Sequence, residues 1–74
     1  MKARAELDAI AESLRLRESA GESLDPRVEA INLRRDGYSV IETMLILATG
    51  LGLGLDDAKE LMIRLAASGE DTFP

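Results

Sequence analysis

The residues most suggestive of chemistry lie between positions 50 and 57, where three glycines alternate with leucine and two aspartates follow. Such a turn, placed after an apolar run, could bind the phosphates of a nucleotide at the start of the next helix. A dinucleotide fingerprint requires G-x-G-x-x-G, but Gly50, Gly52 and Gly54 bring the third glycine one residue too early. A Walker-type loop requires G-K-[ST], which is absent. Because Asp56 and Asp57 would also repel an anion, the pattern favours a turn between two helices over a nucleotide site.

Composition argues against most other site chemistry. The chain has no cysteine and no histidine, so it offers no thiolate ligand, no disulfide and no imidazole base near neutral pH. No nucleophile–base pair stands out, and we expect no enzyme activity, no catalytic residue and no cofactor. Asp56, Asp57 and Glu60 could offer clustered oxygens to a divalent cation. Capping and the helix dipole explain acids at this position more simply, so we expect no metal site.

Four helices are expected to position these residues. Apolar residues recur at three- and four-residue spacing through most of the chain. Asp25 followed by Pro26 is typical of a helix start, and Ser39 with Glu42 has the spacing of a capping box. Gly50 is expected to end the helix that Ser39 begins. The expected helices span residues 2–19, 26–36, 40–50 and 57–68, and residues 69–74 are expected to form a loose tail.

The third expected helix is apolar nearly all round, which indicates a central position. The glycine-rich turn joins it to the fourth helix in a helical hairpin, and Asp56 or Asp57 is expected to cap that fourth helix. The sequence therefore predicts one all-α domain over residues 1–74, a small four-helix fold with a C-terminal helical hairpin.

The stretch from Val40 to Met62 combines a V-I pair at a helix start, the turn T-G-L-G-L-G-L and a helix that opens with A-K-x-L. In these features it resembles the helical hairpin in the C-terminal domain of the bacterial ribosomal stalk protein. The family lysine that follows V-I is Glu42 here, and the turn carries two extra residues. The resemblance thus implies a similar hairpin and does not imply factor binding on the ribosome. The matching positions are Val40, Ile41, Thr49, Gly50, Leu53, Gly54, Leu55, Ala58, Lys59 and Leu61.

Charge and hydropathy both point to a protein partner. The net charge of −5 disfavours nucleic acid, whose backbone is bound by Lys and Arg, and suits a basic protein surface. Four acids in the C-terminal half are candidate partner-binding residues: Glu42, Asp56, Asp57 and Glu60. The third helix is too apolar for three short helices to cover, which predicts an exposed apolar interface. Its candidate residues are Ile41, Leu45, Ile46 and Leu51.

We therefore expect a non-catalytic protein-binding module. It could be a small acidic inhibitor of the immunity-protein or antitoxin type that covers a basic site, or an adaptor, and it could form a homodimer. The alternative is a homodimeric DNA-binding or transcription-regulatory helical domain. Arg27, Arg34 and Arg35 would then form the basic patch, but pairing with Glu29 and Asp36 on one helix face explains these arginines more simply.

No stretch of the sequence indicates a membrane segment. The longest uncharged run, residues 43–55, falls well short of the about 20 residues that span a bilayer. We expect a cytoplasmic protein with no membrane association.

Overall fold

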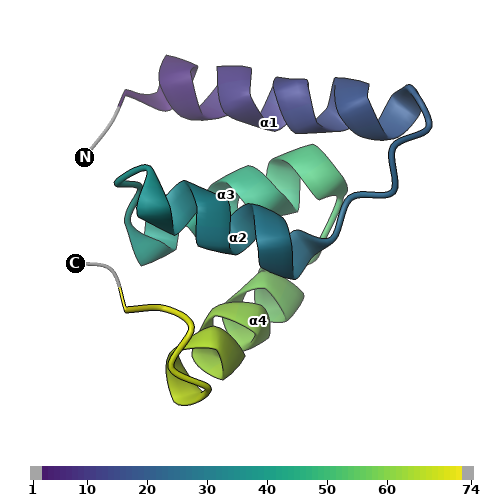
Figure 1. The fold of residues 1–74 in the computed structure, drawn as a ribbon. Helices are drawn as coiled ribbons and strands as arrows, with labels where there is room; N and C mark the ends of the chain where they lie inside the picture. The colour runs from purple at the N-terminus through teal and green to yellow at the C-terminus, as the bar shows by residue number, and fades with distance from the viewer. Residues whose placement is uncertain (1–2, 73–74) are drawn as a thin grey trace.

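The computed structural model describes residues 3–72, and within this range the chain forms four helices and no strand (Figure 1). The helices are α1 (Arg4–Ser19), α2 (Pro26–Arg35), α3 (Val40–Leu51) and α4 (Leu55–Ala67). The predicted all-α class is confirmed. Residue 2, expected in the first helix, and residues 73–74, expected in the tail, lie outside the described residues. None of the described helices is long and apolar enough to cross a membrane.

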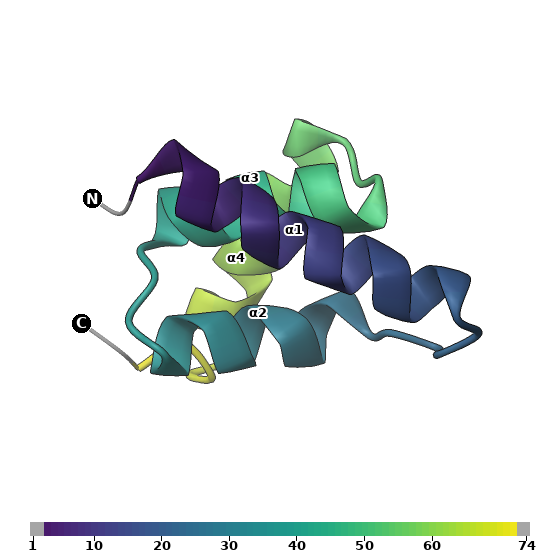
Figure 2. The same ribbon diagram turned by 90° about the horizontal axis from the view of Figure 1, so that it is seen from above.

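α3 is the central helix, as its composition predicts, because it packs against each of the other three. α1 lies on one side of α3 and α4 on the other, and α2 runs beside α3 in the middle layer (Figures 1 and 2). Burying one Leu or Ile side chain in such a core contributes about 1.5–3 kcal/mol. The buried apolar residues are Leu7, Ala11 and Leu14 in α1, Ala30 and Leu33 in α2, Tyr38, Ile46 and Leu47 in α3 or just before it, and Ala58, Met62 and Leu65 in α4.

The predicted starts of α2 and α3 are confirmed by their hydrogen bonds. The Asp25 carboxylate accepts from the backbone N–H of Arg27 at 3.0 Å, and Pro26 occupies the first helical position. At α3, the Ser39 hydroxyl accepts from the Glu42 N–H at 3.1 Å, and the Glu42 carboxylate accepts from the Ser39 N–H at 2.8 Å. Each such cap contributes about 1 kcal/mol to stability.

The turn between α3 and α4 differs from the prediction at both ends. Gly50 does not end α3, because the helix continues to Leu51 and Gly52 is the C-cap, with a left-handed φ of 70°. Neither Asp56 nor Asp57 caps α4. Gly54 takes the N-cap position in an extended conformation without a side-chain bond, so both aspartates fall in the first turn. There they can stabilise the helix dipole instead.

The chain after α4 is held in place, and the loose tail predicted there is wrong for its first residues. The backbone N–H groups of Glu70 and Asp71 both donate to the Leu65 carbonyl, at 2.9 and 3.2 Å. The Glu70 carboxylate pairs with Arg27, and that of Asp71 pairs with Arg34 at 3.0 Å. Both partners lie on α2, far away in sequence, which is why local composition gave no sign of these contacts.

Candidate protein-binding surface

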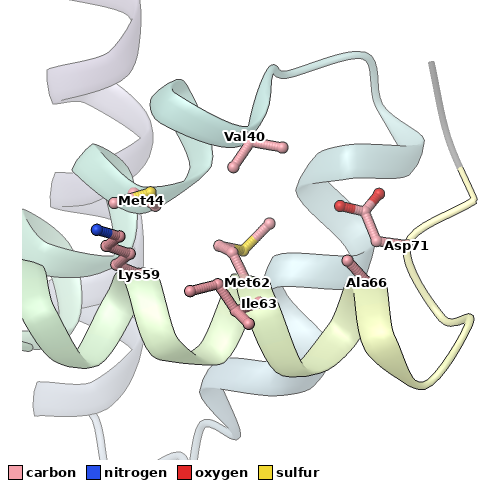
Figure 3. A pocket seen from close by; sticks show the side chains of 7 residues that line it. All are labelled: Val40, Met44, Lys59, Met62, Ile63, Ala66 and Asp71. Atoms are coloured by element: carbon pink, nitrogen blue, oxygen red, sulfur yellow. The ribbon is translucent and has the colours of Figure 1, made fainter.

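A groove of about 350 Å³ lies between α3 and α4 (Figure 3). The turn at residues 52–54 ties the two helices together at one end, and the groove opens toward the start of α3 and the end of α4. Lys59 lies at one end of the groove and Asp71 at the other (Figure 3). The apolar residues that line it are Val40 and Met44 from α3, and Met62, Ile63 and Ala66 from α4.

The groove continues into an apolar stripe on the outer side of α3. Ile41, Met44, Leu45 and Ala48 follow one another at helical spacing, so they share one face of the helix. Ile41 is 60% exposed, and the other three are partly buried. On the α4 side, Ile63 is 57% exposed. We call the combined apolar region the α3–α4 surface, and it consists of Val40, Ile41, Met44, Leu45, Ala48, Met62, Ile63 and Ala66.

The four residues predicted to form an apolar interface differ in their exposure to solvent. Ile41 and Leu45 belong to the α3–α4 surface, and Leu51 is half-buried against the core. Ile46 is only 1% exposed and belongs to the core, so it cannot contact a partner. The physical reason is helical geometry, since Ile46 lies five residues after Ile41 and therefore about 140° round the helix from it.

The four acids predicted to bind a partner also differ in their exposure to solvent. Asp56, Asp57 and Glu60 are exposed on α4. Glu42 is only 3% exposed, and its carboxylate is used in the capping box, so it is not available to a partner. Asp56 and Glu60 lie on the same side of α4 as Ile63, because the three residues are spaced by four and three positions. These two acids therefore follow the outer edge of the groove.

Ion pairs neutralise most of the charged side chains near the groove. Glu60 pairs with Arg64, one turn further along α4. Asp71 is nearly buried with Arg34, which also donates to the Tyr38 carbonyl at 2.6 Å. Within residues 3–72, neither Asp56 nor Asp57 forms an ion pair, although both are exposed.

Of the three arginines of α2 that could form a basic patch for DNA binding, Arg35 is exposed. Arg34 is buried, and Arg27 pairs with Glu70. The hydrogen bond to Glu70 is the main cause of the raised pKa of Arg27, and it lowers the pKa of Glu70 together with a bond from Ser68. The predicted pairing of these arginines with Glu29 is wrong, since Glu29 pairs with Arg17 of α1 at 3.2 Å.

Few groups in the described part of the chain are arranged for chemistry. No group of three or more acidic, histidine or cysteine residues among residues 3–72 could hold a metal ion. A second hollow, of about 260 Å³, contains the Arg27–Glu70 pair beside α4. The Thr43 hydroxyl is buried without a hydrogen-bond partner among the described residues, but it lies in the core and not in either hollow.

Sequence reasoning missed most of the groove. The periodicity of α4 marks Met62 and Ala66 as core residues, and it gave no reason to expect Ile63 beside them at a surface. Only the relative placement of α3 and α4 brings these side chains opposite Val40 and Met44. Comparison of the chain with protein-family models, with curated proteins and with solved structures finds no significant match in any of the three.

Proposed function

We propose that this chain is a non-catalytic protein-binding module that covers part of a partner protein with its α3–α4 surface. The observation that carries the proposal is an apolar groove whose lining includes Ile63, 57% exposed, together with Ile41, which is 60% exposed and lies three residues before the groove residue Met44 on α3. Exposed apolar residues that gather around a hollow are typical of interaction sites. Covering them yields about 25 cal/mol for each Å² removed from water.

The charge of the chain supports a basic partner. The net charge is −5, and Asp56 presents an exposed carboxylate on the same side of α4 as Ile63. Complementary charge accelerates association and selects against acidic partners. These features fit a small inhibitor of the immunity or antitoxin type better than a DNA-binding regulator, because Arg34 is buried and Arg27 is paired with Glu70.

Two matched substitutions test the proposal. Ile63→Asp places a charge on the α3–α4 surface, whereas Leu16→Asp places one on an equally exposed aliphatic position of α1. We expect immobilised wild-type protein and the Leu16→Asp variant to retain the same protein from a lysate of the source cells, and the Ile63→Asp variant to lose it. Retention of that protein by both variants, or no specific retention by the wild type, would contradict the proposal.

The dependence of this binding on salt separates the two forms of the proposal. An inhibitor that relies on Asp56 and Asp57 should lose its partner as ionic strength rises, because exposed charges are screened beyond about 10 Å at 0.1 M salt. An adaptor that binds through Ile41 and Ile63 alone should keep it.

A further inference from the structure

We infer that two copies of this chain can exchange their α1 helices, so that α1 of each copy packs on α3 of the other and an intertwined dimer forms. The inference concerns a surface that is covered in the monomer, and it does not rest on the proposed function. Exchange of an identical element is a low-cost route to a dimer, because the contacts of the monomer form again between the two copies.

α1 is attached to the rest of the molecule mainly through one helix. Among the helices of residues 3–72 it packs only against α3, whereas α2, α3 and α4 pack against one another. Arg17 of α1 also pairs with Glu29 of α2 at 3.2 Å. Arg15 donates to the Thr49 carbonyl of α3 at 3.3 Å. α1 therefore forms an outer layer of the molecule (Figure 1), and the other three helices keep their mutual contacts when it leaves.

The seat of α1 on α3 fits this particular helix. Leu7, Ala11 and Leu14 share one face of α1, and all three are buried. Gly50 of α3 has no side chain at the crossing, where a Cβ would lie only 3.1 Å from Leu14 Cβ. The seat is therefore matched to α1 of this sequence, and a second copy of the chain supplies the same helix.

The connection between α1 and α2 has the features of a hinge. Residues 20–23 are all exposed, and Gly21 among them has a left-handed φ of 95°. The Gly21 N–H donates to the Glu18 carbonyl at 3.1 Å, and the next N–H donates to the Arg17 carbonyl at 3.2 Å. This turn directs the chain back along its own protomer. In the exchanged dimer residues 20–23 extend toward the other copy, so the left-handed turn is no longer required.

The conformation of Gly21 thus separates the two states. A residue with a Cβ is disfavoured at this φ, and the penalty falls on each closed monomer and not on the exchanged dimer. Apart from the two neighbouring residues, no atom of the described chain lies within 4 Å of a Cβ at Gly21, so Gly21→Ala changes the backbone preference without a clash. The groove between α3 and α4 has no α1 residue in its lining, so the dimer keeps two α3–α4 surfaces.

Gly69 provides a matched control for this substitution. It follows α4 in the same kind of turn, with a φ of 79° and free space around a Cβ. Its N–H donates to the Ala66 carbonyl, and the next N–H donates to the Leu65 carbonyl. No helix follows it among residues 3–72. We expect Gly21→Ala to raise the dimer association constant in sedimentation equilibrium at least about ten-fold over the wild type, and Gly69→Ala to leave it unchanged.

Isotope labelling identifies the contact that holds the dimer together. Equal amounts of unlabelled and ¹³C-labelled Gly21→Ala chains are unfolded together and refolded at high concentration. Nuclear Overhauser effects between chains should join the Leu14 methyl groups to the α protons of Gly50, because these groups meet where α1 crosses α3. The wild type, treated in the same way, should show the same effects at lower intensity. A dimer formed through the α3–α4 surface would show this contact only within one chain, and Ile63→Asp would dissociate it.

Four results would overturn the inference. The first is a folded Gly21→Ala variant that stays monomeric at every concentration, and the second is an equal rise in dimer for Gly69→Ala. The third is the absence of Leu14–Gly50 effects between chains in both the variant and the wild type. The fourth is an unfolded Gly21→Ala variant beside a folded Gly69→Ala variant, because exchange relieves the strain only at Gly21. All four leave the proposed function standing, since capture of a partner by the wild type does not require exchange.

Discussion

At the scale of single residues, Gly50 determines how closely α1 and α3 approach. A Cβ atom at this position would lie 2.8 Å from the Ala11 carbonyl oxygen and 3.1 Å from the Leu14 Cβ. Since the first of these is a backbone atom, α1 would have to move. We expect Gly50→Ala to lower the free energy of unfolding by about 1–3 kcal/mol in chemical denaturation, although alanine favours a helix more than glycine does.

Gly54 provides the matched control for this substitution. It has a negative φ, and an added Cβ would meet only Asp57 Oδ2, at 3.7 Å. Gly54→Ser adds a capping hydroxyl to α4 and restricts the unfolded chain, so it should raise stability by about 0.5–1 kcal/mol. If Gly50→Ala were as stable as the wild type, the close crossing of α1 and α3 would be wrong.

The ion pair between Arg34 and Asp71 should be the most important charge contact in the molecule. Their side chains are 6% and 8% exposed. Removing one partner of a buried pair leaves the other charge without compensation, so we expect Asp71→Ala to cost about 3 kcal/mol in thermal or chemical unfolding. Glu70→Ala breaks the neighbouring exposed pair with Arg27 and should cost much less. Equal effects of the two substitutions would show that Asp71 is not buried.

At the scale of elements, the two faces of α3 should respond differently to the same substitution. Ile46 is 1% exposed and Ile41 is 60% exposed. We expect Ile46→Ala to lower the free energy of unfolding by about 2–5 kcal/mol, because it leaves a cavity in the core. Ile41→Ala should change it by less than about 0.5 kcal/mol. Comparison of the two denaturation midpoints checks this assignment, and a reversed order would mean that α3 is rotated about its axis.

Helix starts could be predicted from sequence where a side chain supplies the signal. Asp25 and Ser39 both accept the backbone N–H bonds that their positions imply. The start of α4 could not be predicted in this way, because Gly54 caps it with backbone geometry alone. The end of α3 was misplaced for a related reason. Gly50 allows α1 to pack closely against α3, and Gly52 adopts the left-handed conformation that ends the helix. The sequence alone does not distinguish these two roles of glycine.

At the scale of the whole molecule, the sequence could show that α3 carries too many apolar residues to be fully covered, but not which of them stay uncovered. That choice depends on where the other helices lie. α1 covers the side of α3 that contains Gly50, and α4 covers only part of the next side, which leaves Ile41 exposed and creates the groove. The contacts of the C-terminal segment could not be predicted for the same reason. Glu70 and Asp71 reach Arg27 and Arg34 only when α2 and α4 are packed together.

Ionisation of the Tyr38 side chain should make the stability of the whole molecule depend on pH. Its side chain is buried where α2 leads into α3, and its pKa is raised above 10.0, first because burial disfavours the phenolate. The negative charges of Glu6, Asp36 and Glu42 raise this pKa further. Because the folded-state pKa is higher than the unfolded one, the stabilising contribution is complete below pH 10.0 and is lost as the pH rises through the folded pKa.

Titration of this side chain is simple to measure, because it is the only tyrosine in the chain and tryptophan is absent. We expect the ultraviolet absorbance of tyrosinate to appear at higher pH in the native protein than in protein unfolded by guanidinium, where the midpoint should be about 10. The melting temperature should fall above pH 10.0, and it should fall less in a Tyr38→Phe variant, which separates this effect from other effects of high pH. Coincident midpoints for native and unfolded protein would mean that Tyr38 is in water, and that the α2–α3 connection does not pack as described.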